Sequence, residues 1–217
     1  MDFWRQLDII SPERLQCPIT VIGCGGIGSP TILSLAKMGC RDITVYDPDS
    51  VEEHNLPNQF FRLQDLHQPK AAMLAEIVES FTGARIKARG EEVQRQKLTG
   101  LVISAVDSMA ARQDIWQNCL RFNPEALLYI DGRMSGEVCR IFTVKPVDPE
   151  EVRLYEQTLY SDAEAWEEPC TSRAIIYNVY MAASLIVHQV KNFLGHEPIS
   201  RELAFDFKTL SFICSQG

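Results

Sequence analysis

The sequence predicts an α/β fold with a mostly parallel sheet, helices on both faces and an antiparallel extension at the C-terminal end. Short β-branched apolar runs alternate with helical patterns from residue 19 to residue 131, as they do in parallel sheets. The next segment, 137–144, alternates loosely and is expected to pair antiparallel, and two further short strands end the chain. No repeat or linker divides the sequence, so residues 1–217 are interpreted as one domain.

A glycine turn lies between the first strand and the first helix. Gly23, Gly25 and Gly28 form the spacing G-x-G-x-x-G after the apolar run 19–22, and Gly26 adds a further glycine. Such glycines let the backbone come close to a phosphate, and the N–H groups at the helix start favour an anion. A strand before, a helix after and acidic residues about twenty residues further on are the context of a Rossmann-like nucleotide site. The turn is therefore predicted to bind a nucleotide.

The remaining elements are placed by their apolar periods and by capping residues. Gly132 is expected to close the fifth strand, and residues 145–171 are interpreted as a long exposed crossover because they combine proline and acidic residues with few aliphatic ones. Strands are expected at 19–22, 43–46, 85–93, 101–106, 126–131, 137–144, 203–207 and 210–214. Helices are expected from the glycine turn to Gly39 and at 69–82, 108–122 and 172–194.

Composition excludes several classes of protein. The hydrophobic share of 46% and the charged share of 23% are those of a globular domain. The formal net charge of −8 argues against a nucleic-acid partner, because no basic excess is present to neutralise a phosphate backbone. No apolar run reaches the length of a membrane span, and residues 1–11 lack the pattern of a signal peptide. We therefore expect a cytoplasmic protein without a membrane partner.

The cysteines also limit the chemistry. The sequence has seven of them and no C-x-x-C pair, which argues against a zinc site and, in a reducing compartment, against disulfides. Most are expected to be buried and structural. Cys170, between Pro169 and Thr171, is predicted to lie at the start of the last helix, where the helix dipole favours the thiolate.

Polar residues gather where the predicted parallel strands end. Asp47 and Asp49 close the second strand, Asp107 closes the fourth, and the long loop that begins at Ser50 leads to Lys70. A lysine neutralises phosphate as a point charge, and an aspartate can hold Mg²⁺. These residues favour a triphosphate and metal site. Asp107 is equally compatible with an N-cap of the next helix, and Asp47 alone would also suit the ribose of a nicotinamide cofactor.

Four stretches together resemble the ubiquitin-activating-enzyme superfamily in its bacterial ThiF/MoeB/HesA form: GCGGIGS, YDPDSVEEHNLPNQ, QPKAA and SAVDS. The resemblance covers nearly the whole chain. It implies an adenylyltransferase that uses ATP and Mg²⁺ to adenylate the C-terminal glycine of a ubiquitin-like or sulfur-carrier protein. In many members a cysteine then takes the acyl group as a thioester.

The resemblance also implies roles for single residues. Asp47 would bind the ribose, Asn55 and Lys70 the phosphates, and Asp107 the metal. The predicted nucleotide-binding residues are Gly23, Gly25, Gly26, Gly28, Asp47, Asp49, Asn55, Gln59, Arg62 and Lys70. The predicted catalytic residues are Arg5, Lys70, Asp107 and Cys170.

Two of these roles belong to the N-terminal segment and to the crossover loop. The sequence Phe-Trp-Arg-Gln within residues 1–17 resembles the segment that reaches into the ATP site of a neighbouring protomer, so Arg5 would act there and the protein would be a homodimer. Cys170 resembles the cysteine of the family's crossover loop and would accept the acyl group. An inert structural role for this cysteine stays open.

The sequence departs from the family pattern at two points. Asn58 stands where the loop pattern Asn-x-x-Arg-Gln has its arginine, so either Arg62 takes its place or the site is degenerate. The two zinc-binding C-x-x-C pairs of many relatives are missing, which predicts a protein without zinc. The alternatives are a degenerate member that scaffolds a heterodimer, an NAD-dependent oxidoreductase, and an enzyme that adenylates a small molecule or an RNA nucleoside.

Overall fold

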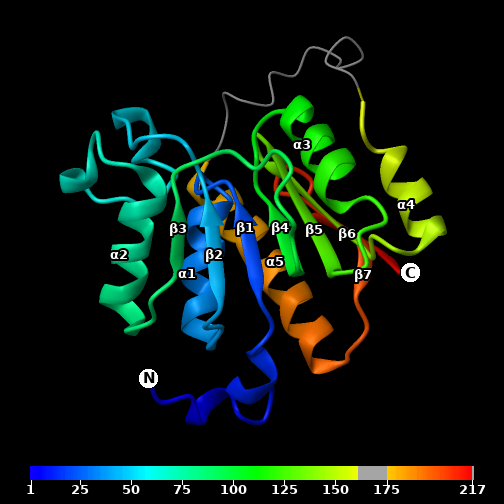
Figure 1. The fold of residues 1–217 in the computed structure, drawn as a ribbon, viewed down its shortest axis with the longest axis horizontal. Helices are drawn as coiled ribbons and strands as arrows, with labels where there is room; N and C mark the ends of the chain where they lie inside the picture. Colours follow the sequence, from blue (N-terminus) through cyan, green and yellow to red (C-terminus); the bar gives the residue numbers. More distant parts are fainter. Residues whose placement is uncertain (161–174, 217) are drawn as a thin grey trace.

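The protein is built on an eight-stranded sheet with the strand order β3-β2-β1-β4-β5-β6-β7-β8 (Figure 1). The computed structural model describes residues 1–160 and 175–216. The strands are β1 (Ile19–Ile22), β2 (Ile43–Tyr46), β3 (Lys87–Arg89), β4 (Gly100–Ser104), β5 (Ala126–Ser135), β6 (Val138–Val144), β7 (Ser200–Asp206) and β8 (Ser211–Gln216). The first five strands in chain order pair in parallel, and β6, β7 and β8 continue the sheet antiparallel. This confirms the predicted mixed sheet.

Helices cover both faces of the sheet, as predicted. The helices are α1 (Gly28–Met38), α2 (Lys70–Thr82), α3 (Met109–Ile115), α4 (Pro149–Glu156) and α5 (Ile176–Gly195), and a π-helical turn, η5 (Trp116–Leu120), extends α3. One core layer joins α1, α2 and α5 to the sheet, and the other joins α3, η5 and α4 to its opposite face. Within β4, Leu101 and Ile103 belong to the first layer and Val102 to the second. Because both faces of β4 are buried, its sequence is a continuous apolar run instead of an alternating one.

Strand β5 is longer than predicted, because Gly132 does not end it. The strand continues to Ser135 and pairs with β6 along this extension. A Cβ atom on Gly132 would lie 3.0 Å from the Ile186 side chain and 3.1 Å from that of Ile27. This glycine therefore allows α5 to pack closely on the sheet. The predicted strand 85–93 is shorter than expected and forms only the exposed edge strand β3.

The prediction of an exposed crossover over residues 145–171 is wrong for its described part. Residues 149–156 form α4, whose N-cap Asp148 accepts hydrogen bonds from the N–H groups of Glu150 and Glu151. The helix buries Val152 and Tyr155 against the sheet. Its acidic first turn lies at the positive end of the helix dipole, where negative charge is favourable. The rest of the segment, 161–171, lies outside the described residues.

The N-terminal segment contains two short 3-10 helices, η1 (Trp4–Gln6) and η2 (Pro12–Leu15), below the sheet in Figure 1. The chain rises from there into β1, so this segment lies at the end of the sheet opposite to the carboxyl ends of the parallel strands (Figure 1). Trp4, Leu7 and Ile9 expose 75%, 50% and 65% of their surface. These apolar side chains are left without cover by the described part of the chain.

Of the six described cysteines, Cys24, Cys40, Cys119 and Cys139 are buried, Cys214 is exposed, and none forms a disulfide. None of the helices in the described ranges combines the length and apolar character needed to cross a membrane.

Candidate active site

The glycine turn follows β1 and packs against the backbone that follows β4. Gly23 has a φ of +95°, and a Cβ atom there would lie 2.7 Å from the backbone oxygen of Ala105. A Cβ atom on Gly28 would lie 1.9 Å from the oxygen of Gly23. Neither position can hold a side chain without moving backbone. Among the described residues, nothing accepts a hydrogen bond from the N–H groups of Gly25 and Gly26, which precede α1. The turn therefore offers free donors at a helix start, as an anion requires.

Asp47 fixes this turn to the end of β2. The carboxylate accepts hydrogen bonds from the N–H groups of Cys24 at 2.6 Å and Asp49 at 2.9 Å, and the residue is 5% exposed. Burial raises the pKa of the Asp47 carboxyl, and the two N–H donors offset part of that rise. Each oxygen keeps a second lone pair. The side chain thus shapes the turn, and its predicted contact with a ribose stays a prediction.

Lys70 and Asp49, both predicted to bind the nucleotide, form an ion pair with each other. Lys70 begins α2, its side chain is only 9% exposed, and its Nζ lies 2.9 Å from Oδ2 of Asp49. The backbone N–H of Lys70 also donates to the Asp49 oxygen at 2.8 Å. The ammonium group is therefore held at the carboxyl end of β2, and two of its three N–H donors remain for a ligand.

The loop after β2 packs over the glycine turn. Asn55 is 6% exposed, and its side-chain oxygen accepts a hydrogen bond from the N–H of Glu52, which caps the short helix η3 (Glu53–Asn55). The Gln59 amide nitrogen is the nearest atom to a Cβ built on Gly25, at 3.8 Å. The amide oxygen of Gln59 is buried and has no hydrogen-bond partner within the described chain. Gln59 is thus a free acceptor beside the turn, and the Asn55 side chain caps η3.

Arg62 is engaged elsewhere. Its guanidinium pairs with Asp65 at 2.7 Å across the short helix η4 (Leu63–Asp65) and lies 3.7 Å from Glu76. The bonds to Asp65 use Nε and Nη2 of Arg62. The structure gives no support to the expectation that Arg62 replaces the arginine missing at Asn58.

Asp107 is exposed and lies three residues beyond Ser104, in the loop that follows β4. It makes no hydrogen bond or ion pair with any described residue. The N-cap of α3 is its neighbour Ser108, whose hydroxyl accepts a hydrogen bond from the N–H of Ala111 at 3.1 Å. The capping alternative for Asp107 is therefore wrong. An exposed, unpaired carboxylate is a ligand of the kind that Mg²⁺ prefers.

The two remaining predicted residues are not brought to this place. Arg5 is exposed on η1, at the opposite end of the sheet from the glycine turn (Figure 1). It cannot reach the site of its own chain, and its role in a neighbouring protomer stays a prediction. Cys170 lies outside the described residues.

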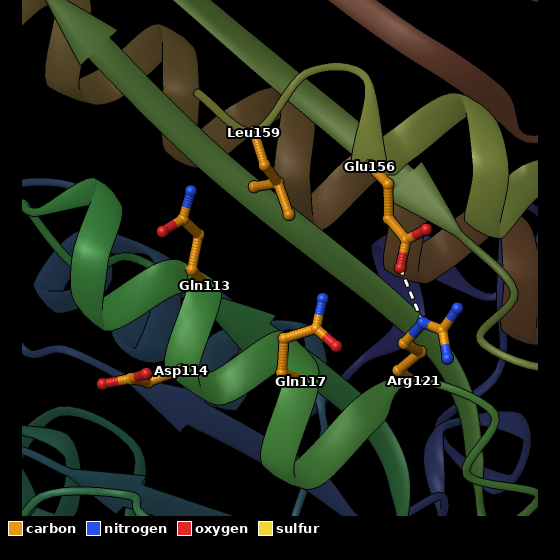
Figure 2. A pocket seen from close by; sticks show the side chains of 6 residues that line it. All are labelled: Gln113, Asp114, Gln117, Arg121, Glu156 and Leu159. Carbon is orange, nitrogen blue, oxygen red and sulfur yellow. Dashed lines mark hydrogen bonds and ion pairs between the residues drawn. The ribbon is translucent and has the colours of Figure 1, made fainter. Parts of the chain in front are cut away.

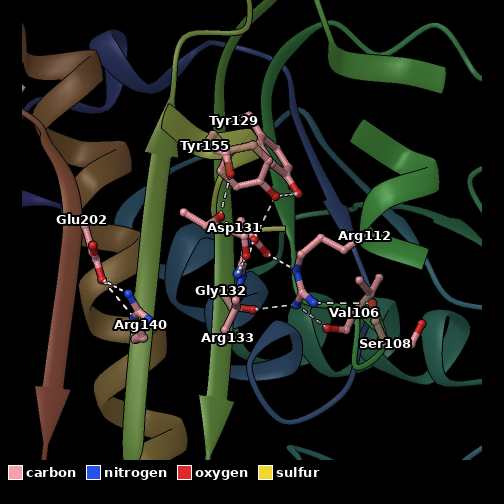
Figure 3. Close-up of polar contacts among 11 residues, drawn as sticks. Val106, Ser108, Arg112, Tyr129, Asp131, Gly132, Arg133, Arg140, Tyr155 and Glu202 are labelled. Atoms are coloured by element: carbon pink, nitrogen blue, oxygen red, sulfur yellow. Dashed lines mark hydrogen bonds and ion pairs between the residues drawn. The ribbon is translucent and has the colours of Figure 1, made fainter. Parts of the chain in front are cut away.

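Sequence reasoning missed a buried ionic network around Asp131, inside β5 (Figure 3). Asp131 is completely buried and contacts Arg112 at 2.6 Å, Arg133 at 2.8 Å and the Tyr155 hydroxyl at 3.0 Å. Burial alone would raise the pKa of Asp131, but the two guanidinium groups hold it below its usual value. Arg112 also contacts the backbone beside Asp107. The only signal in the sequence is the acid at the end of a strand, and that signal cannot identify its arginine partners.

Two surface pockets are lined by residues other than the predicted ones. Figure 2 shows an open pocket between α3 and α4, lined by Gln113, Asp114, Gln117, Arg121, Glu156 and Leu159. Glu156 there accepts hydrogen bonds from Arg121 at 2.7 Å and from the Trp116 indole at 3.1 Å. These bonds join α4 to η5. A second opening is lined by loop residues Glu52, Glu53, His54 and His67.

The sheet order and the glycine turn define a Rossmann-like α/β protein with an anion-binding turn at the point where the strand order reverses. The sequence pattern of the ThiF family matches residues 13–214, and the chain belongs to that family. The resemblance to the ubiquitin-activating-enzyme superfamily is thereby confirmed.

Individual relatives extend this result. The chain is 26% identical over 216 residues to the sulfur carrier protein ThiS adenylyltransferase of Escherichia coli, covering 91% of this chain and 80% of that protein. It is 37% identical over 114 residues to the NEDD8-activating enzyme E1 catalytic subunit of Dictyostelium discoideum, covering 48% of this chain. The match spans only 25% of that subunit and similar shares of its plant and nematode counterparts.

The fold is shared with solved structures. Escherichia coli MccB, crystallised with AMPCPP and MccA, superposes with a TM-score of 0.74 over 94% of this chain and 65% of that chain. The sequence identity is 16%, so this likeness concerns the fold alone.

Proposed function

We propose that this protein is an ATP-dependent adenylyltransferase that activates the C-terminal glycine of a ubiquitin-like or sulfur-carrier protein. The observation that carries the proposal is the convergence of three different groups at the carboxyl ends of adjacent strands. Free N–H groups follow β1, the Lys70 ammonium follows β2, and the unpaired Asp107 carboxylate follows β4. The names of the relatives, an adenylyltransferase for ThiS and an activating enzyme for NEDD8, support the same chemistry.

The chemistry requires positive charge where two anions meet. A carrier carboxylate attacks the α-phosphorus of ATP, a new O–P bond forms, and the bond to pyrophosphate breaks. The N–H groups of Gly25 and Gly26 would bind phosphate oxygens, and Lys70 would neutralise them as a preorganised charge. Asp107 would hold Mg²⁺, which when bound offsets further phosphate charge. Asp47, by fixing the turn, keeps the N–H donors aimed at the ligand.

Further parts of the proposal concern the assembly. Arg5 of a second protomer would complete the phosphate site, so the active form would be a homodimer. The Cys170 thiolate would attack the acyl carbon of the adenylate and release AMP, leaving a thioester. Residues 1–17 would then extend from one protomer into the ATP site of the other. The absence of zinc and a cytoplasmic location also stay predictions.

A second candidate is a degenerate member of the family that scaffolds a heterodimer. The observation that favours it is the absence of an arginine at the loop position held by Asn58, together with the engagement of Arg62 by Asp65. Such a protein would bind a paralogous chain through the exposed N-terminal segment and would not turn over ATP.

Exchange of labelled pyrophosphate into ATP, in the presence of a candidate carrier ending in Gly-Gly, tests the leading proposal. Asp107→Ala is expected to lower the exchange rate by about 100-fold or more while the fold stays intact. Asp114→Ala is the matched control, because Asp114 is an exposed aspartate on α3 of the same chain. Full exchange in Asp107→Ala would overturn the metal role, and no exchange in the wild type with any carrier would favour the scaffold.

A further inference from the structure

The buried network around Asp131 contacts the backbone on both sides of Asp107 (Figure 3). The Arg112 guanidinium donates through Nη2 to the backbone oxygen of Val106 at 2.8 Å. It donates through Nη1 to the oxygen of Ser108 at 3.4 Å. Val106 and Ser108 are the residues directly before and after Asp107. A single planar group therefore contacts both flanks of the turn that presents the exposed carboxylate.

Arg112 is itself fixed from the other side. Its Nε lies 2.6 Å from Oδ1 of Asp131, and its Nη2 also lies 3.3 Å from the oxygen of Gly132. Both Asp131 and Arg112 are buried, at 0% and 4% exposure. The arginine thus connects the middle of β5 to the loop that follows β4. Its donors diverge toward acceptors on β5 and on the loop that follows β4, which the single ammonium group of a lysine cannot reproduce.

Arg133 contacts the other carboxylate oxygen of Asp131 but does not contact the turn around Asp107. Arg133 donates to Oδ2 of Asp131 and to the oxygen and hydroxyl of Thr158, and none of its hydrogen bonds reaches the turn around Asp107. Asp131 is therefore compensated by two arginines, of which only Arg112 contacts that turn. Both arginines therefore compensate the buried carboxylate, but Arg112 alone of the two also holds the loop.

We propose that Arg112 is a positioning residue for Asp107, anchored by Asp131, and that it sets the orientation in which the Asp107 carboxylate meets the Mg²⁺ and phosphates of bound ATP. The inference rests on the proposed function through the metal role of Asp107. Groups that orient a metal ligand from behind typically change metal affinity or activity by about 10- to 100-fold when they are altered.

The test compares Arg112→Lys with Arg133→Lys, since both variants disturb the same carboxylate and only the first loses the contacts to the turn. Calorimetry measures Mg²⁺ binding in the presence of a non-hydrolysable ATP analogue, which requires no turnover. Hydrogen exchange of residues 105–109 reports the turn directly. Arg112→Lys is expected to weaken Mg²⁺ binding by about 10-fold or more and to speed exchange in this segment, whereas Arg133→Lys leaves both near wild type.

Several results would overturn the proposal. Equal losses in the two variants would reduce Arg112 to a general stabilising role, and unchanged Mg²⁺ binding in Arg112→Lys would remove its link to Asp107. Should Arg112→Lys fail to fold, Arg112→Gln takes its place, because Arg133 and the Tyr155 hydroxyl still contact the Asp131 carboxylate in that variant; the same shifts are expected. If the wild-type protein binds neither the ATP analogue nor Mg²⁺, the proposed function fails first, and the inference fails with it.

Discussion

Removal of the Asp131 carboxylate should be among the most destabilising single changes in this chain. The group has no exposed surface and contacts two guanidinium groups and one hydroxyl. Asp131→Ala would leave Arg112 and Arg133 as buried charges without their anion, since their side chains are only 5% and 15% exposed. Breaking a buried pair in this way costs about 3–5 kcal/mol of the free energy of unfolding. In a domain of this size that corresponds to a fall in Tm of about 6–20 °C.

Urea and thermal unfolding followed by circular dichroism measure this loss. Glu202→Ala is the control, because Glu202 pairs with Arg140 at 2.7 Å in a partly exposed bridge and should cost no more than about 1 kcal/mol. The Asp131 contribution also has a pH signature. Its pKa is lowered on folding, so its stabilisation is present above the unfolded pKa of about 4 and is lost as the pH falls through the folded value. A loss no larger than that of Glu202→Ala would refute the argument.

Two further predictions concern the glycine turn and the thiols. Gly28→Ala should abolish nucleotide binding and lower the free energy of unfolding by about 1–3 kcal/mol, because its Cβ would lie 1.9 Å from a backbone oxygen. Gly90→Ala is the control and should change little, because no atom lies within 4 Å of a Cβ built there. Titration with ATP and urea unfolding of both variants check this. Burial raises the pKa of the Cys24 thiol well above its usual value, so iodoacetamide should modify exposed Cys214 long before Cys24 in peptide mapping, and equal rates would contradict the burial.

The parts of the fold that depend on local chemistry were predictable from the sequence. The first strand, the glycine turn and α1 follow from β-branched residues, glycine spacing and Gly39, whose φ of +118° ends the helix. The antiparallel addition of β6 was also expected, from its loose alternation. In each of these cases a short stretch of chain contains the information that decides its structure.

The errors arose where neighbouring elements decide the outcome. Gly132 was expected to end a strand, but the close approach of α5 requires a glycine inside that strand. Helix α4 was not predicted because its acidic composition is typical of a loop. Asp148 nevertheless caps the helix, and Val152 and Tyr155 are buried. The acidic first turn is stabilised by the helix dipole, which composition alone does not reveal.

The candidate site shows the same limit. The residues that follow strands β1, β2 and β4 could be placed together, because parallel strands end at one edge. The contacts between side chains could not. Nothing in the sequence shows that Arg62 is held by Asp65, or that Arg112, nineteen residues from Asp131, joins it to the turn around Asp107.

The measurement that tests the central claim most directly is a calorimetric titration of the purified protein with ATP and Mg²⁺, and separately with NAD. The account predicts binding of ATP and none of NAD. Lys70→Ala should weaken ATP binding at least about tenfold, the size of one lost charge-assisted hydrogen bond, while Lys87→Ala, which removes an exposed lysine paired with Asp42, should not. Binding of NAD without ATP, or ATP binding that Lys70→Ala leaves unchanged, would contradict the account.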